Sequence, residues 1–82
     1  MKDLRQLRGS VLMEVIKNEV ANAPKGMQTA YFGFFLVRYA HKIGNGYTPD
    51  EIAHLCGMRP SYVIEVRKFQ KINKMLREDG LL

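Results

Sequence analysis

Apolar residues recur along this chain at helical spacing rather than in the alternation that is typical of strands. Proline and glycine separate the apolar stretches at residues 24–26, at residues 44–46 and at Gly57. These two residue types commonly mark turns between regular elements. The pattern therefore predicts an all-α protein.

The first apolar stretch predicts one amphipathic helix, because its apolar residues lie three to five positions apart. They are Leu4, Leu7, Val11, Val15 and Val20, and Leu12 and Ile16 widen the stripe. Two starts are compatible with this sequence. Asp3 can cap the helix with Gln6 reaching back, or the helix begins at Ser10, because Gly9 and Ser10 lower helix propensity by about 1 kcal/mol.

Residues 27–43 predict a second helix that is apolar on nearly every side. Its large apolar residues are Tyr31, Phe32, Phe34, Phe35, Leu36, Val37 and Tyr39. Such a helix has to be surrounded. A chain of 82 residues offers few helices for this, so we expect a homodimer that pairs through it. Lys42 in the last turn and Gly44 as a left-handed stop predict where the helix ends.

Thr48 marks the clearest helix start in the chain. Thr48 is a good N-cap, Pro49 suits the first helical position, and Glu51 completes a capping box. This third helix is expected to end at Gly57 and to bury Ile52, Ala53, Leu55 and Cys56.

A final helix is predicted from Pro60 to about Arg77, with Asp79 and Gly80 ending it. We therefore expect a single compact domain of four helices over residues 1–82. Residues 1–44 would supply the core and dimerisation helices, and residues 48–78 the last two helices.

The charge balance favours a partner with a negative surface. Thirteen Lys and Arg residues against eight Asp and Glu residues give a formal net charge of +5, a sign that suits phosphate backbones or acidic proteins. The single cysteine, Cys56, cannot form an internal disulfide, and no secretory leader is apparent. The longest uncharged stretch, Gly26–Val37, is well short of the roughly 20 residues that span a bilayer. We expect a cytoplasmic protein that does not enter a membrane.

Residues 49–68 resemble the helix-turn-helix DNA-binding proteins of bacteria and their phages. That motif has a small residue at its fifth position, where Ala53 stands, and glycine at its ninth, where Gly57 stands. Glycine tolerates the positive φ of this turn, which costs other residues about 1 kcal/mol or more. The motif's apolar positions are also matched, by Ile52, Cys56, Met58, Val63 and Val66.

The resemblance implies a small bacterial, phage or plasmid transcription regulator whose second motif helix reads the major groove of duplex DNA. Two such helices in a dimer would need half-sites roughly 34 Å apart. The ending of the chain resembles the approach to the wing of winged-helix regulators. It stops before any hairpin, so no wing is expected.

Motif positions place six residues toward DNA: Arg59, Pro60, Ser61, Ile64, Glu65 and Lys68. Arg59 is expected to donate twice to guanine, Ser61 to bond a base or a phosphate, and Lys68 to bond a phosphate. Ile64 could touch a thymine methyl group and Glu65 could accept from cytosine. Thr48, with the backbone amides beside it, could hold another phosphate.

Beyond the motif, the final helix carries the most basic stretch of the chain. Arg67, Lys71 and Lys74 fall in one narrow sector at 100° per residue, where they could follow DNA phosphates. Tyr62, Phe69, Ile72 and Leu76 gather on the far side. The first half of this helix is expected to pack within the motif, and its second half against the amino-terminal helix or a partner chain.

Other interpretations stay open at this point. Many helical hairpins have a glycine turn, and many charged helix faces are only solvated. The scaffold could instead serve a protein-binding adaptor or inhibitor that uses Tyr62, Ile64 and Glu65. It could also bind nucleic acid without sequence preference through the basic stretch alone.

Catalysis, cofactors and metals are not expected. His54 and Cys56 point about 200° apart on a helix, so they cannot share a metal ion. Ser10, His41 and His54 show no triad spacing, and no glycine-rich phosphate loop is present. His41, near a helix end, is expected to meet terminal carbonyls or solvent.

Overall fold

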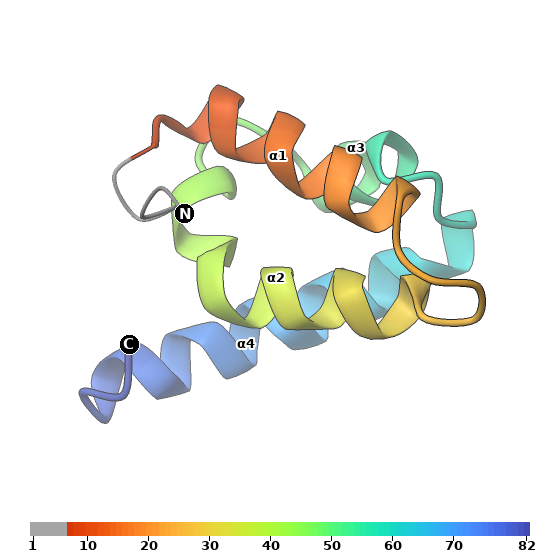
Figure 1. The fold of residues 1–82 in the computed structure, drawn as a ribbon. Coiled ribbons are helices and arrows are strands. Elements are labelled where there is room, and N and C mark those ends of the chain that lie inside the picture. The colour runs from red at the N-terminus through yellow and green to blue at the C-terminus, as the bar shows by residue number, and fades with distance from the viewer. Residues whose placement is uncertain (1–6) are drawn as a thin grey trace.

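The computed structural model describes residues 7–82. The chain forms α1 (Gly9–Ala21), α2 (Gln28–Ile43), α3 (Pro49–Leu55), a short 3-10 turn η2 (Pro60–Tyr62) and α4 (Val63–Glu78) (Figure 1). No strand occurs in the described part. The predicted all-α fold with four helices is confirmed.

The first helix begins at Gly9, with Arg8 in extended conformation before it. Of the two predicted starts, the one at Ser10 is therefore confirmed to within one residue, whereas Asp3 and Gln6 lie outside the described residues. Gly9 has a packing role, because a Cβ there would lie only 2.8 Å from the Lys42 carbonyl oxygen. Glycine thus lets the start of α1 approach the end of α2 closely.

The buried face of α1 differs from the predicted stripe. Its buried residues are Leu12, Met13, Ile16 and Val20. Val11 is exposed and Val15 is only half-buried. Leu12, Ile16 and Val20 of the predicted stripe are therefore confirmed, whereas Val11 is exposed and Met13 takes a buried position that the stripe did not include.

The second helix runs between α1 and α4 and forms the centre of the core (Figure 1). Phe32 is fully buried, and its ring meets the rings of Tyr62 and Phe69 edge-on at centroid distances of 6.4 and 6.3 Å. Gly33 makes room for α4, because a Cβ there would lie 3.1 Å from the Phe69 ring. Helix α2 therefore holds α4 through aromatic packing.

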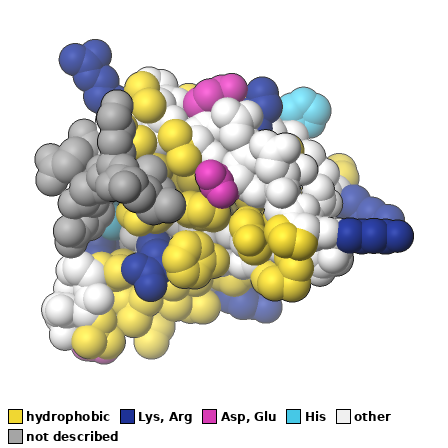
Figure 2. Space-filling view, viewed as in Figure 1, with side chains coloured by type: hydrophobic (Ala, Val, Ile, Leu, Met, Phe, Trp, Pro, Cys, Tyr) yellow, Lys and Arg dark blue, Asp and Glu magenta, His cyan; other side chains and the backbone are white. Residues whose placement is uncertain are grey.

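The chain's own helices leave one side of α2 open, as expected for so short a chain, and the homodimer expected to cover it stays a prediction. Phe34 is 53% exposed and Met27 is 45% exposed. Figure 2 shows apolar side chains gathered over the α2 side of the molecule in this view. Arg38 covers part of this side, with its guanidinium carbon 4.7 Å from the centre of the Phe34 ring.

The predicted left-handed stop at Gly44 is also wrong. Gly44 has right-handed values, with φ −64° and ψ −18°, and its N–H continues the helical pattern to the Ala40 carbonyl. The chain turns two residues later, where the N–H groups of Gly46 and Tyr47 both donate to the Ile43 carbonyl. Glycine at position 44 still matters, because a Cβ would lie 3.0 Å from the Ala40 oxygen.

The helix-turn-helix forms as predicted. The Thr48 N–H donates to Glu51 Oε1 at 2.9 Å, and the Glu51 N–H donates to Thr48 Oγ1 at 3.2 Å, which completes the capping box. Ile52, Ala53 and Cys56 are buried and Leu55 is half-buried. Gly57 takes φ 71°, and the next N–H, of Met58, donates back to the Ala53 carbonyl at 2.8 Å. The chain thus reverses where the motif requires it.

Helix α4 crosses both α3 and α2. Val66 is fully buried and Val63 half-buried, so its first half packs within the motif as expected. Its second half packs mainly on α2 and not on the amino-terminal helix, which was one of the two expected neighbours. Packing on a partner chain, the other expected neighbour, stays a prediction. Gly33 lets α2 approach α4 closely at Phe69, and beyond that point the Asn73 amide donates to the Val37 carbonyl of α2 at 2.9 Å.

None of the helices within residues 7–82 combines the length and the apolar character needed to cross a lipid bilayer.

Candidate nucleic-acid interface

The face of α4 that points away from the core is exposed and cationic. At 100° per residue, Val66, Phe69 and Asn73 lie on one side of the helix, against α2 and α3, and the opposite side faces solvent. We call this opposite side the outer face of α4. It consists of Ile64, Arg67, Lys68, Lys71, Lys74 and Met75, all of them exposed.

The approach to α4 adds further polar residues at the same end. Arg59 is extended, and Pro60 begins the 3-10 turn that leads into the helix. Arg59, Pro60 and Ser61 are all exposed. Because proline has no N–H to satisfy and a preset φ, it suits this start. The residues that the motif places first in the groove are thus accessible.

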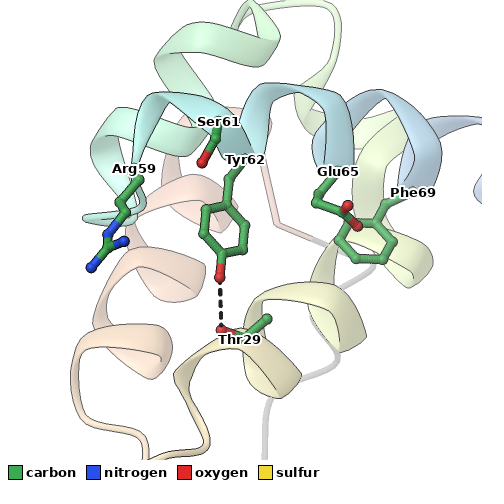
Figure 3. Close-up of a pocket in the computed structure, with 6 residues that line it drawn as sticks. All are labelled: Thr29, Arg59, Ser61, Tyr62, Glu65 and Phe69. Atoms are coloured by element: carbon green, nitrogen blue, oxygen red, sulfur yellow. Dashed lines mark hydrogen bonds between the residues drawn. The ribbon is translucent and has the colours of Figure 1, made fainter.

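A hollow lies between this approach and the start of α2 (Figure 3). Its lining residues are Thr29, Arg59, Ser61, Tyr62, Glu65 and Phe69. Figure 3 shows Tyr62 pointing from η2 to Thr29, and the two hydroxyl oxygens are 3.4 Å apart. Tyr62 is therefore engaged in joining η2 to α2.

The cations of the outer face are only weakly paired. Lys68 lies 3.4 Å from Glu65 and Lys74 lies 3.9 Å from Glu78, in pairs whose side chains are 39% to 70% exposed. Exposed pairs of this kind contribute about 0–1 kcal/mol, so phosphates can displace them. Arg67 and Lys71 make no ion pair with any described residue.

The structure gives Thr48 a local role. Its N–H and hydroxyl oxygen are both used in the capping box with Glu51. Pro49 offers no N–H, and the carboxylates of Asp50 and Glu51 occupy the first turn of α3. This chemistry disfavours a phosphate there, so the phosphate contact of Thr48 stays a prediction that the local charge opposes.

A buried polar cluster joins α4 to α2, and sequence reasoning missed it. Asn73 is 1% exposed, and its amide nitrogen donates to the Val37 carbonyl at 2.9 Å and lies 3.0 Å from His41 Nδ1. Its amide oxygen accepts from Arg77 Nε at 2.9 Å. His41 thus contacts a side chain of α4 where terminal carbonyls or solvent were expected, and it is only half-buried, so part of it still meets solvent.

The predicted apolar side of α4 needs one correction at the same point. Ile72 is at the margin, with 36% of its surface exposed, whereas the neighbouring Asn73 takes the buried position. Asn73 stands four residues after Phe69 and three before Leu76, so helical spacing puts it on the same side as both. A polar residue within an apolar face was the only available signal, and it did not reveal the partners.

Two ionisable groups are shifted by their surroundings. Burial, then the nearby charge of Arg77 and, more weakly, that of Lys42 lower the pKa of His41 from its ordinary 6.5. A hydrogen bond with Asn73 would raise this pKa only if the ring donated to the amide oxygen, whereas the amide nitrogen is the atom that faces Nδ1. Burial raises the pKa of the Cys56 thiol to about 11, which keeps it protonated and unreactive at neutral pH. Within residues 7–82, no three His, Cys, Asp or Glu side chains group closely enough to hold a metal ion.

Comparison with known proteins identifies the domain. A family model described as the HTH-like domain, where HTH stands for helix-turn-helix, matches residues 9–79. No curated protein and no solved structure gives a significant match. The match covers α1 to α4 and therefore includes the supporting helices as well as the motif. The chain belongs to the HTH-like domain family.

Proposed function

We propose that this protein binds duplex DNA sequence-specifically, as a small transcription regulator, by placing α4 in the major groove. The outer face of α4 carries this proposal, because four exposed cations stand opposite the side of the same helix that packs on the core. A helix of 16 residues is about 24 Å long, and the major groove is about 12 Å wide and admits one helix. A cytoplasmic location and a bacterial, phage or plasmid origin stay predictions.

The exposed residues divide into two roles. Arg59, Ser61 and Ile64 lie at the amino-terminal end, from which helix-turn-helix proteins contact base edges. Lys68, Lys71 and Lys74 follow along the outer face and suit phosphates on either side of the groove. Glu65 is only partly exposed and pairs with Lys68, so a contact from Glu65 to cytosine would require that pair to open.

Selection of bound duplexes from a random DNA pool tests base readout. The wild-type protein is expected to enrich one motif. Arg59→Ala should bind the selected site roughly 10- to 100-fold more weakly, because a bidentate pair with guanine is worth about 1–3 kcal/mol. The preference at one motif position should also disappear.

Arg8→Ala is the matched control, since Arg8 is an exposed arginine that precedes α1. It should leave both the selected motif and the affinity nearly unchanged. Pool selection that enriches no motif, although the protein binds DNA, would contradict sequence-specific recognition and leave only binding through charge.

We also propose that the open side of α2 pairs with a second copy of the chain. An apolar groove there is lined by Met27, Ala30, Tyr31, Phe34 and Phe35. Gly33, which faces Phe69 of α4, and Phe34 are consecutive, so they point about 100° apart around α2. The open side thus lies beside α4 and not opposite it, which allows a two-fold pair to present both α4 helices to one duplex.

Sedimentation of the protein over a range of concentrations tests this pairing. The wild type is expected to sediment as a dimer and Phe34→Glu as a folded monomer, because a carboxylate would be buried in the paired surface. Ile64→Glu, which changes an exposed apolar residue on α4, should remain dimeric. A monomeric wild type at high concentration would contradict the proposal.

A protein-binding adaptor is the second candidate, and two exposed apolar residues favour it. Ile64 is 70% exposed and Met75 is 62% exposed, and both belong to the outer face of α4. Tyr62, which this alternative also invoked, is half-buried beside Phe32 and Thr29 and offers little surface. Absence of DNA binding by the wild type at low salt would favour the adaptor.

A further inference from the structure

The cluster that joins the second half of α4 to α2 is built around one buried amide. Among the described residues, Asn73 is the one polar or charged side chain that is buried. Val37 and His41 stand one helical turn apart on α2, and Arg77 stands one turn beyond Asn73 on α4. All three contact the Asn73 amide at 2.9 to 3.0 Å.

The partners of Asn73 allow only one orientation of its amide. The Val37 carbonyl can only accept a hydrogen bond, and the Arg77 Nε–H can only donate one. The amide nitrogen must therefore face Val37, and the amide oxygen must face Arg77. The second hydrogen of the same nitrogen then points to His41 Nδ1, 3.0 Å away.

This orientation determines the state of the histidine. Because Asn73 donates to Nδ1, that ring nitrogen must accept, so the imidazole is neutral and carries its proton on Nε2. The Asn73 carbonyl would favour a protonated ring in that position, but it is turned toward Arg77. If His41 were protonated, its Nδ1–H would face the Asn73 amide N–H, and that buried amide hydrogen would have no acceptor.

The surrounding charges also favour the neutral form of the His41 ring. Arg77 on α4 and Lys42 on α2 are the charged groups that bear on His41. A cleft beside His41, between the end of α2 and the second half of α4, is lined by Ala40, His41, Gly44, Asn45, Gln70, Asn73 and Arg77. No carboxylate occurs among these lining residues, so nothing in the described cleft would compensate an imidazolium charge.

We propose that Asn73 is a positioning residue that fixes the second half of α4 against α2. We propose further that its hydrogen bonds to α2 persist only while the His41 imidazole is unprotonated. Acidification then loosens residues 70–77 of α4. Lys71 and Lys74 lie in these turns, on the outer face. The expected loss of DNA affinity in acid rests on the proposed function. The expected loosening of the contact between α4 and α2 does not.

The sign of the pH effect follows from linkage. A histidine whose pKa is lower in the folded than in the unfolded chain stabilises the fold fully above pH 6.5. This stabilisation is lost as the pH falls below 6.5 towards the pKa of the folded state. A general charge effect on DNA binding has the opposite sign, because protonated histidines attract phosphates. The proposed loss of affinity in acid is therefore distinguishable from simple electrostatics.

The first experiment needs no DNA. NMR of the free protein should show His41 with its proton on Nε2 at pH 7.5 and with a pKa below the ordinary 6.5. The ratio of folded to unfolded wild type, from urea titrations, should fall about threefold or more between pH 7 and pH 5 relative to His41→Gln. Gln offers Asn73 an acceptor that does not titrate. His54→Gln, at an exposed site on α3, should follow the wild type.

The second experiment measures affinity for a random-sequence duplex between pH 5 and pH 8. Wild type and His54→Gln should lose affinity in acid relative to His41→Gln. Asn73→Asp should reverse the pH dependence of stability, because a carboxylate beside His41 favours the protonated ring. If the stability measurements agree with expectation but no variant binds DNA, the pH-dependent contact between Asn73 and His41 is supported and only the proposed function is contradicted. Identical pH profiles of wild type and His41→Gln, or a proton on Nδ1 at pH 7.5, would overturn the inference.

Discussion

Reversing the charges of Lys71 and Lys74 together is expected to weaken binding to random-sequence duplex DNA by roughly 10- to 100-fold at low salt. Both side chains are exposed on the outer face of α4, so the fold should tolerate the change. Each phosphate contact that is lost lowers the slope of log affinity against log salt by about 1, so the double variant should show a slope smaller by about 2. Fluorescence anisotropy titrations at several salt concentrations measure both quantities.

The matched control changes the same net charge elsewhere. Arg8→Glu combined with Lys17→Glu places two reversals at and near α1, which has no extensive contact with α4. This variant should retain most of the affinity and of the salt slope. Equal losses in the two double variants would mean that DNA senses only the overall charge, and would remove α4 from its special role.

Truncating Phe32 to alanine is expected to lower the free energy of unfolding by about 3–5 kcal/mol. Phe32 is fully buried, and the rings of Tyr62 and Phe69 close around it edge-on. Its removal leaves a cavity where α2 meets η2 and α4. Because small domains are stable by only about 5–15 kcal/mol, much of the protein should be unfolded at moderate urea concentrations.

Phe34→Ala provides the comparison, since Phe34 is on the same helix but 53% exposed. Measured by urea unfolding at concentrations where the chain is monomeric, it should cost less than about 1 kcal/mol. If the two substitutions cost the same, the assignment of Phe32 to the core and Phe34 to the open side of α2 would be wrong.

The local features of the motif were predictable because each depends on residues close in sequence. The capping box of Thr48 and Glu51 and the positive φ of Gly57 are set by backbone chemistry within one turn of helix. Helical spacing also placed Val66 inside and the cations outside. These signals are sufficient to establish the turn and the exposure of the candidate contacts.

Features that depend on the packing of distant elements were not predictable from the same patterns. The turn after α2 is closed at Gly46 and Tyr47 and not at Gly44, because both N–H groups reach the Ile43 carbonyl. In sequence Gly9 indicates only weak helix propensity, yet Gly9 and Gly33 each let another element approach closely. The sequence likewise left open which helix supports the second half of α4.

The contact between Asn73 and His41 shows the same limit for the candidate site. The two residues are 32 positions apart, and their bond exists only because α4 lies across α2. Neither an asparagine in an apolar face nor a histidine near a helix end indicates its partner. Charge patterns identified the outer face of α4, but not the buried cluster that supports it.

An NMR titration of the isotope-labelled protein with a short DNA duplex shows directly which surface binds DNA. We expect the largest amide shift changes at residues 59–61 and along the outer face of α4, from Ile64 to Lys74, and little change on the open side of α2. Shift changes centred on Met27 to Phe35, with α4 unaffected, would contradict DNA binding through α4.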